Sequence, residues 1–173
     1  IYDKEDIEHY LRYSLGAERI LWLDHGYLKG DDTNSHIDTL ARFCSTDTIA
    51  YVKCTDENDE HFEALSQMET QLKTFVQANG NPYNLVALPM AQPVFDKDDG
   101  HRLPATYANF LIINDAVMMP VYNLSTDEEA LKAIKTAFPN HEIIPVDCSP
   151  LIRQHGSLHC ITMQYPAEVE FVI

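Results

Sequence analysis

Residues 36–54, HIDTLARFCSTDTIAYVKC, predict the first half of a repeated α/β unit. The runs at 36–44 and 48–54 contain β-branched and aromatic residues, which favour strands, and residues 45–47 are polar turn formers. We therefore expect two strands joined by a tight turn.

The residues after this hairpin predict a helix and a returning strand. Thr55 or Asp56 is a suitable N-cap for the helix, and NLVALPM at 84–90 has the composition of a buried strand. The apolar stripe of the helix consists of Phe62, Leu65, Met68, Leu72, Phe75 and Val76. We expect a polar, turn-rich loop at 91–104.

The same order then recurs, with the turns at Asp47 and Asp115 in matching places. Its members are a strand at 106–114, a turn at 114–115, a strand at 116–122, a helix capped by Ser125 or Thr126, and a strand at 142–146. A repeat of strand, strand, helix and strand predicts an α/β fold of repeated ββαβ units.

Shorter features flank these two units. We predict a helix over 3–15, a strand at 19–23 (RILWL), the first strand of a further unit at 157–166 (SLHCITMQYP) and a last strand at 168–173 (EVEFVI). The chain then holds about two and a half units, fewer than a closed ring of them needs. It also begins without an initiating Met or a signal-peptide core, so we expect it to be part of a longer protein.

Composition excludes several classes of protein. The chain has 173 residues, of which 45% are hydrophobic and 23% charged, as in a globular domain with a sizeable core. No apolar run approaches the roughly 18 residues that a membrane span requires. The net charge of −15 argues against a nucleic-acid partner, whereas it permits a cationic ligand.

The four cysteines are too widely spaced for an ordinary zinc site, because no CxxC pair is present. Four cysteines formally allow two disulfides, but we expect free thiols in a reducing cytoplasm, with Cys44, Cys54 and Cys148 in structural positions. A zinc site that uses Cys44, Cys54 and His61 is the disfavoured alternative, and we expect neither a metal nor a cofactor.

The triplet HID at 36–38 is a candidate for chemistry. If it is a strand, His36 and Asp38 lie on one face and offer a proton carrier beside a cation anchor. The alternative is a polar strand end without function. Asp32, in the loop GDDT at 30–33, either orients this loop through hydrogen bonds or faces a cationic ligand.

The stretch GSLHC at 156–160 offers a nucleophile. Cys160 is either a reactive thiolate near a cation or a buried inert thiol. In a strand His159 would point to the opposite face, so we predict that it is a packing residue or supports the site from a second layer, and that the base for the thiol comes from elsewhere. Gly156 would allow close approach of the backbone to a ligand.

GDDTNSHID at 30–38, followed by LHCITMQYP at 158–166, resembles the agmatine deiminases and the related bacterial-type peptidylarginine deiminases of the guanidino-group-modifying superfamily. The resemblance implies a five-bladed α/β propeller of ββαβ units, the pentein fold. Residues 1–173 would be the C-terminal portion of a single catalytic domain of this kind.

The resemblance also implies roles for individual residues. Cys160 would be the nucleophile, His36 the general acid and base, and Asp38 the carboxylate that binds the guanidinium group. Asp32 and Gly156 complete the candidate substrate-binding set. Family members take a further carboxylate and a glutamate from the preceding half, so a chain that starts at Ile1 is expected to be inactive alone.

The implied activity is cofactor-free hydrolysis of agmatine to N-carbamoylputrescine and ammonia, in putrescine biosynthesis. A peptidylarginine or arginine deiminase and a non-catalytic binding module stay open. The sequence departs from the family pattern at six positions, which leaves the identity of the guanidine open: Ser35, Gln154, His155, Ser157, Met163 and Tyr165. Arg153 is the cation to examine as a partner for a substrate carboxylate. We expect a small cationic guanidino substrate, neither nucleic acid nor membrane, and leave room for a homodimer.

Overall fold

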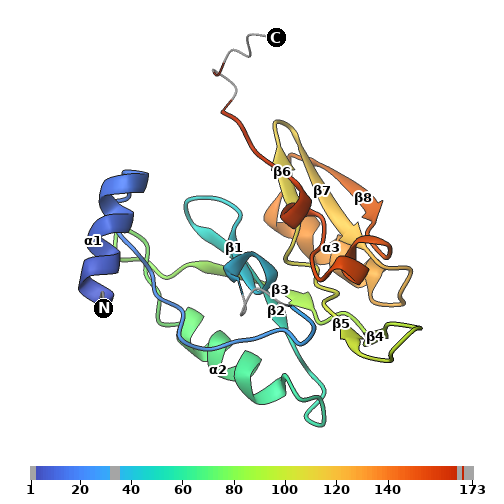
Figure 1. Cartoon of the computed structure of the whole chain (residues 1–173). Helices are drawn as coiled ribbons and strands as arrows, with labels where there is room; N and C mark the ends of the chain where they lie inside the picture. The colour runs from blue at the N-terminus through green and yellow to red at the C-terminus, as the bar shows by residue number, and fades with distance from the viewer. Residues whose placement is uncertain (1–2, 32–35, 167–168, 170–173) are drawn as a thin grey trace.

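The computed structural model describes residues 3–31, 36–166 and 169, and it contains two three-stranded sheets of the same strand order (Figure 1). The first sheet consists of β1 (Ala41–Phe43), β2 (Thr48–Lys53) and β3 (Asn84–Pro89), with α2 (Phe62–Leu72) between β2 and β3. β1 and β2 are antiparallel, whereas β2 and β3 are parallel, with Thr48 opposite Asn84.

The second sheet repeats this topology. It consists of β6 (Leu111–Ile113), β7 (Ala116–Val121) and β8 (Glu142–Asp147), with α3 (Asp127–Ala137) between β7 and β8. β6 and β7 form the antiparallel pair, and β7 and β8 the parallel pair, with Ala116 opposite Glu142. The predicted order of strand, strand, helix and strand is thus present twice, in a mixed α/β structure whose described residues do not join the sheets into a closed ring.

The core lies where α3 meets both sheets. α3 contacts β8 of its own sheet and also β2 and β3 of the first sheet, while α2 contacts β2. Four consecutive residues of β2 are buried because helices cover both of its faces. Ala130 and Ile134 on α3 are fully buried as well.

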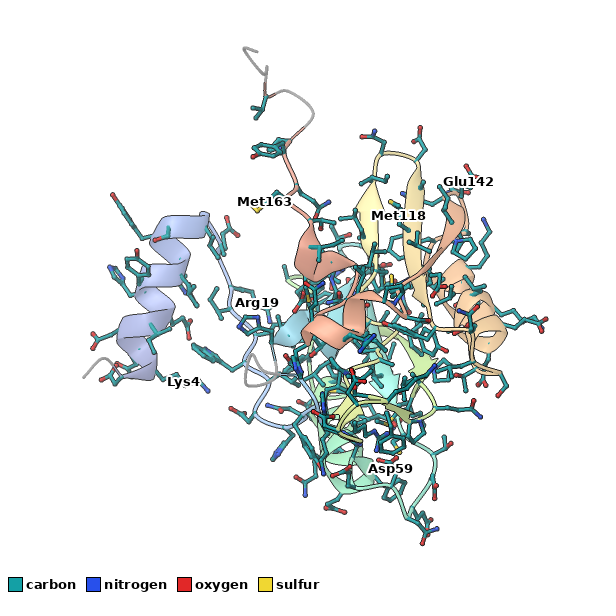
Figure 2. All side chains as sticks on the ribbon, turned by 45° about the vertical axis from the view of Figure 1, so that its right-hand side comes forward. Lys4, Arg19, Asp59, Met118, Glu142 and Met163 are labelled. Carbon is teal, nitrogen blue, oxygen red and sulfur yellow. The ribbon has the colours of Figure 1, made fainter. Side chains whose placement is uncertain are left out.

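The first helix, α1 (Lys4–Leu15), stands apart from this core (Figures 1 and 2). Asp3 and Asp6 form a capping box at its start, but no residue of the helix is buried. Its main attachment is to the following connector, where the Trp22 indole donates a hydrogen bond of 3.1 Å to Glu8. Arg19 joins that connector to the body by donating to the carbonyl of Val76 at 3.0 Å.

Several predicted strands are absent or shorter. Residues 19–23 form no strand, because no neighbouring strand pairs with them. The strand predicted at 106–114 is reduced to β6, and the loop at 91–104 contains the short hairpin of β4 (Val94–Phe95) and β5 (Arg102–Leu103). The strand predicted at 168–173 lies outside the described residues except for position 169.

Two of these corrections bear on the candidate site. The strand predicted at 36–44 begins instead with a 3-10 helix, η1 (Ile37–Thr39), and the strand predicted at 157–166 is replaced by the 3-10 helix η3 (His159–Ile161). Both helices have the same local cause. Thr39 Oγ1 donates to the carbonyl of His36 at 2.8 Å, and Thr162 Oγ1 to that of His159 at 2.8 Å. Such local bonds compete with strand pairing.

Within the described ranges, no helix is long and apolar enough to cross a lipid bilayer.

Candidate active site

Four side chains from three distant segments meet beside η1 and η3. His159 Nδ1 lies 2.7 Å from Oδ2 of Asp38, and the Asn109 side-chain amide donates to the same oxygen at 3.0 Å. Oδ1 of Asn109 accepts the backbone N–H of His159 at 2.8 Å and lies 3.5 Å from the sulfur of Cys160. Asp38 and Cys160 therefore belong to one constellation, as their predicted roles require.

Within the described residues, side chains engage only one oxygen of the Asp38 carboxylate. Both side-chain hydrogen bonds to this carboxylate reach Oδ2, and within the described part of the chain Oδ1 accepts none. The side chain is 20% exposed. A carboxylate whose Oδ2 is fixed in this way can accept further N–H groups at Oδ1 without rearranging.

The strand geometry assumed for His159 is wrong. We predicted a packing or second-layer role, on the ground that strand neighbours point to opposite faces. In a 3-10 helix successive side chains are instead about 120° apart, so His159 and Cys160 lie on neighbouring faces. Its contact with Asp38 makes His159 a functional candidate, and Asn109 is one that sequence reasoning missed.

Contrary to the prediction, His36 does not lie in a strand. It is the residue before η1, it is exposed, and its carbonyl accepts from Thr39. Because residues 37–39 form a helix, the argument that His36 and Asp38 share a strand face is wrong, although both belong to the same short segment. Asp32, the other acidic candidate, lies outside the described residues.

Cys160 differs from the other thiols in its exposure. Cys54 and Cys148 are buried and Cys44 is partly buried, whereas Cys160 is exposed. Burial raises the pKa of Cys44 to about 11 and also raises the pKa of the Cys54 and Cys148 thiols. These three stay protonated near neutral pH, which leaves Cys160 as the accessible thiol.

Native alkylation is therefore expected to modify Cys160 first. Iodoacetamide needs a thiolate that solvent can reach, and only Cys160 is exposed among the four cysteines. Peptide mass spectrometry after brief labelling at pH 7.5 should find the carbamidomethyl group on Cys160. Faster labelling of Cys44 would contradict this ranking.

Gly156 lies directly against the cysteine. A β-carbon added at Gly156 would come within 3.0 Å of the Cys160 β-carbon and 3.6 Å of its sulfur. The absence of a side chain therefore lets the turn before η3 pack against the thiol. This contact gives Gly156 a role beside the predicted one of close approach to a ligand.

A pocket of about 650 Å³ opens beside Asp38 and His159. Its walls are largely apolar and include Ile20, Leu21, Leu23, Ile37, Phe43 and Phe75. The connector at 19–23, which was predicted as a strand, thus forms a wall of this pocket. The volume suits a small molecule, and a mostly apolar lining with a few polar groups is typical of ligand pockets.

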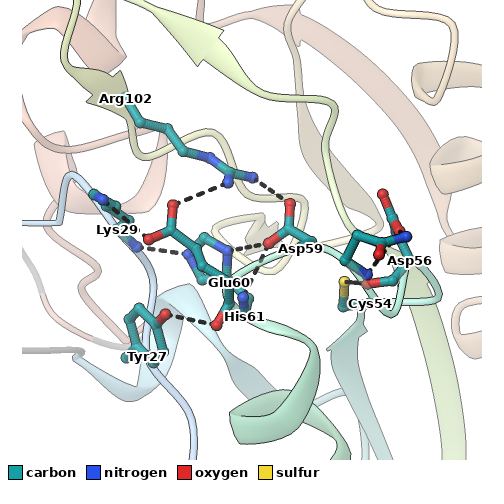
Figure 3. A network of polar contacts seen from close by, with 9 residues as sticks. Tyr27, Lys29, Cys54, Asp56, Asp59, Glu60, His61 and Arg102 are labelled. Carbon is teal, nitrogen blue, oxygen red and sulfur yellow. Dashed lines mark hydrogen bonds and ion pairs between the residues drawn. The ribbon is translucent and has the colours of Figure 1, made fainter.

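Residues 27–30, which lie upstream of His36 in the sequence, are held by a polar network around His61 (Figure 3). His61 is fully buried, with Nδ1 2.6 Å from Asp59 and Nε2 accepting the Lys29 backbone N–H at 2.9 Å. Asp59 also pairs with Arg102 at 3.2 Å. At Gly30, whose φ is +88°, an added β-carbon would lie 2.3 Å from the carbonyl oxygen of Arg102. The position of Lys29 and Gly30 therefore depends on His61 and on the absence of a side chain at residue 30.

The electrostatics of this network favour a neutral histidine. Burial lowers the pKa of His61, and its hydrogen bond to Asp59 offsets this only in part. Burial alone would raise the pKa of Asp59, but hydrogen bonds from His61 and Arg102 outweigh it and lower that pKa. A neutral imidazole that donates Nδ1–H to an ionised Asp59 is consistent with the lowered pKa of both residues.

We expect stability to fall as the pH drops from 7.5 to 5.5. The folded state binds a proton at His61 less readily than the unfolded state does, because the pKa of His61 is lowered by burial. An unfolded histidine has a pKa of about 6.5. The contribution of neutral His61 to stability is therefore complete above that pH and decreases as the pH falls below it. The thermal midpoint of His61→Phe, which keeps an aromatic ring beside Tyr27, should be lower overall and should change less between these pH values. His9→Gln, at an exposed position, is the control. An unchanged pH dependence in His61→Phe would contradict the assignment.

The zinc alternative has no support in the geometry. Both ring nitrogens of His61 are engaged, by Asp59 and by the Lys29 backbone. Over residues 3–31, 36–166 and 169, no three histidine, cysteine or acidic side chains gather as metal ligands do.

Arg153 faces the β4–β5 hairpin. Its Nε lies 3.3 Å from Asp96 and its Nη2 2.8 Å from Asp98. The guanidinium group of Arg153, which was the candidate partner for a substrate carboxylate, is thus already paired with two carboxylates of the protein.

Comparisons with known proteins show which family the chain resembles. Residues 2–166 match the model of the Porphyromonas-type peptidyl-arginine deiminase family. A Marinomonas sp. (strain MWYL1) protein, provisionally named an agmatine deiminase, is 34% identical over 178 residues, which cover 94% of this chain and 48% of the relative. The chain thus spans about half the length of the curated relatives it matches.

Solved structures that are similar to this chain also include deiminases. A Porphyromonas gingivalis crystal structure, provisionally named an arginine deiminase, is 52% identical with a TM-score of 0.92, over 96% of this chain and 48% of that one. A C. jejuni agmatine deiminase variant, solved with substrate bound, is 44% identical with a TM-score of 0.83, over 91% of this chain and 45% of that one.

Proposed function

Because this chain belongs to the Porphyromonas-type peptidyl-arginine deiminase family, we propose that it contributes the nucleophile and a guanidinium-binding carboxylate to an agmatine deiminase. The protein would convert agmatine to N-carbamoylputrescine and ammonia, on the route from arginine to putrescine. The observation that carries the proposal is the constellation in which Asp38 and the exposed Cys160 are joined through Asn109.

Binding would use the open oxygen of Asp38. A guanidinium group is planar and cationic, and it presents N–H donors in a fork that suits a carboxylate. With Oδ2 fixed by His159 and Asn109, Oδ1 is the oxygen available to the substrate within the described part of the chain. The aliphatic part of agmatine suits the largely apolar pocket beside Asp38.

The first chemical step would be attack of the Cys160 thiolate on the central guanidinium carbon. A carbon–sulfur bond forms, and the tetrahedral adduct collapses with cleavage of one carbon–nitrogen bond. His36, as general acid, gives its proton to the departing nitrogen, which leaves as ammonia. An amidino group remains attached to the sulfur.

Water completes the reaction in the second step. His36, now neutral, removes a proton from a water molecule that attacks the same carbon, so a carbon–oxygen bond forms and the carbon–sulfur bond breaks. The ureido product leaves and the thiolate is restored. Guanidinium and water are thus converted to a urea and ammonium, without a cofactor. Histidine suits both steps because its ordinary pKa lies near neutrality.

Agmatine is the preferred substrate in this proposal. A free arginine or a peptide brings a carboxylate or a backbone that requires a further partner, and Arg153 is already paired with Asp96 and Asp98. Steady-state ammonia release by the full-length protein with agmatine, arginine and a blocked arginine peptide tests this. A higher kcat/KM for either arginine substrate would contradict it.

The remaining expectations belong to the same proposal. The repeated ββαβ topology supports an arrangement in which these units form part of a five-bladed propeller. We also propose a cytoplasmic location and leave room for a homodimer.

A further inference from the structure

The segment between β5 and β6 makes two separate connections between the η1 and η3 regions. Residues 105–110 are all buried, although they form no strand. One connection runs through Asn109 and the other through Thr106. Both start from the same short segment, yet they reach different parts of the site.

The connection through Thr106 reaches groups without a chemical role. Thr106 Oγ1 donates to the carbonyl of Thr39 at 2.7 Å. The Tyr122 hydroxyl donates to the Thr106 carbonyl at 2.8 Å and lies 2.7 Å from Ser157 Oγ. These groups are buried and hold the two regions together as part of the fold.

The connection through Asn109 reaches the proposed reacting groups themselves. Its amide nitrogen donates to Oδ2 of Asp38 at 3.0 Å and to the Asp38 carbonyl at 3.3 Å. Its amide oxygen accepts the backbone N–H groups of His159 at 2.8 Å and Cys160 at 3.4 Å. The side chain is 0% exposed, so water does not substitute for these bonds.

We propose that Asn109 is a positioning residue that sets the separation between the Asp38 carboxylate and the Cys160 thiol. A primary amide suits this task because its nitrogen donates and its oxygen accepts, whereas an ionised carboxylate only accepts and a hydroxyl must use a single oxygen for both roles. The proposal rests on the proposed function, in which Asp38 holds the carbon that Cys160 attacks. Misplacement of reacting groups by about 1 Å can cost 100-fold in rate.

Three variants of the full-length protein test the proposal. Asn109→Ala removes both ends of the amide, and we expect kcat to fall about 100-fold with a much smaller change in KM. Asn109→Asp keeps the acceptor for the two backbone N–H groups but sets a second carboxylate about 3.0 Å from Asp38. Two carboxylates this close share one proton and titrate as a pair with one raised pKa.

Asn109→Asp should therefore show activity that depends on pH. At low pH the shared proton restores the bond to Asp38, so the variant should approach wild-type kcat there. At higher pH both carboxylates ionise and repel, and the kcat should fall toward that of Asn109→Ala. A residue that only stabilises the fold would not produce this rescue.

Tyr107→Phe is the matched control. Tyr107 is a fully buried member of the same segment, but its hydroxyl bonds to Asp127 at 2.6 Å and Thr126 at 2.8 Å, toward α3. This variant should lose comparable thermal stability and keep wild-type kcat. Equal losses of kcat in Tyr107→Phe and Asn109→Ala would overturn the proposal, and so would a flat pH profile in Asn109→Asp.

A second measurement separates this proposal from the proposed function. The rate of Cys160 alkylation against pH should shift to higher pH in Asn109→Asp, because the added negative charge lies beside the sulfur. In Tyr107→Phe it should be unchanged. If wild type releases no ammonia from any guanidine, the proposed function fails. An unshifted alkylation curve in Asn109→Asp would overturn the role of Asn109 independently.

Discussion

Cys160→Ala in the full-length protein is expected to abolish ammonia release from agmatine. Without the sulfur no covalent intermediate forms, and loss of a catalytic nucleophile typically lowers kcat by about 10⁴-fold or more. Binding should stay detectable, because Asp38 and its partners His159 and Asn109 are unchanged. Coupled ammonia detection measures turnover, and isothermal titration calorimetry measures binding.

Cys44→Ala is the matched control for this variant. It removes a partly buried thiol that burial holds protonated, and its turnover should stay near that of wild type. Residual activity of Cys160→Ala within tenfold of wild type would contradict the assignment of the nucleophile.

Asp38→Asn is expected to lower kcat/KM for agmatine by roughly 100-fold or more. The substitution preserves shape but removes the negative charge that would pair with the guanidinium and that faces His159 at 2.7 Å. Loss of one partner from a desolvated charged pair costs about 3 kcal/mol or more, which corresponds to that factor. Steady-state kinetics should show a raised KM together with a reduced kcat.

An exposed acidic residue supplies the control for charge. Asp115→Asn changes net charge equally, but Asp115 lies in the turn between β6 and β7. Its KM for agmatine should equal that of wild type. If Asp38→Asn leaves KM unaltered, Asp38 does not bind the guanidinium.

The repeated topology was predictable because its cause is local. Strands β2, β3, β7 and β8 are apolar runs between turn formers, and both inter-strand helices carry an apolar stripe at helical spacing. Helix start signals were less reliable. Thr126 directly precedes α3, but its side chain makes no capping hydrogen bond. The N-cap of α2 is His61, so the predicted caps Thr55 and Asp56 are wrong. Exceptions such as 19–23 arise because an apolar run becomes a strand only where a neighbouring strand pairs with it.

The site was only partly predictable because two short helices and one buried amide decide it. HIDT and HCIT share a threonine three residues after a histidine, and this pattern is the signal that could have indicated the 3-10 helices. Asn109 stands in a largely apolar run, which marks it as unusual. Its partners Asp38 and Cys160 are distant in sequence, so only the tertiary structure identifies them.

Mass spectrometry of the full-length protein, quenched by acid during turnover of agmatine, tests the central claim most directly. We predict that the peptide containing Cys160 carries an adduct equal in mass to agmatine less ammonia, and that Cys160→Ala carries none. Rapid ammonia release with an unmodified Cys160, or an adduct at another residue, would contradict the account.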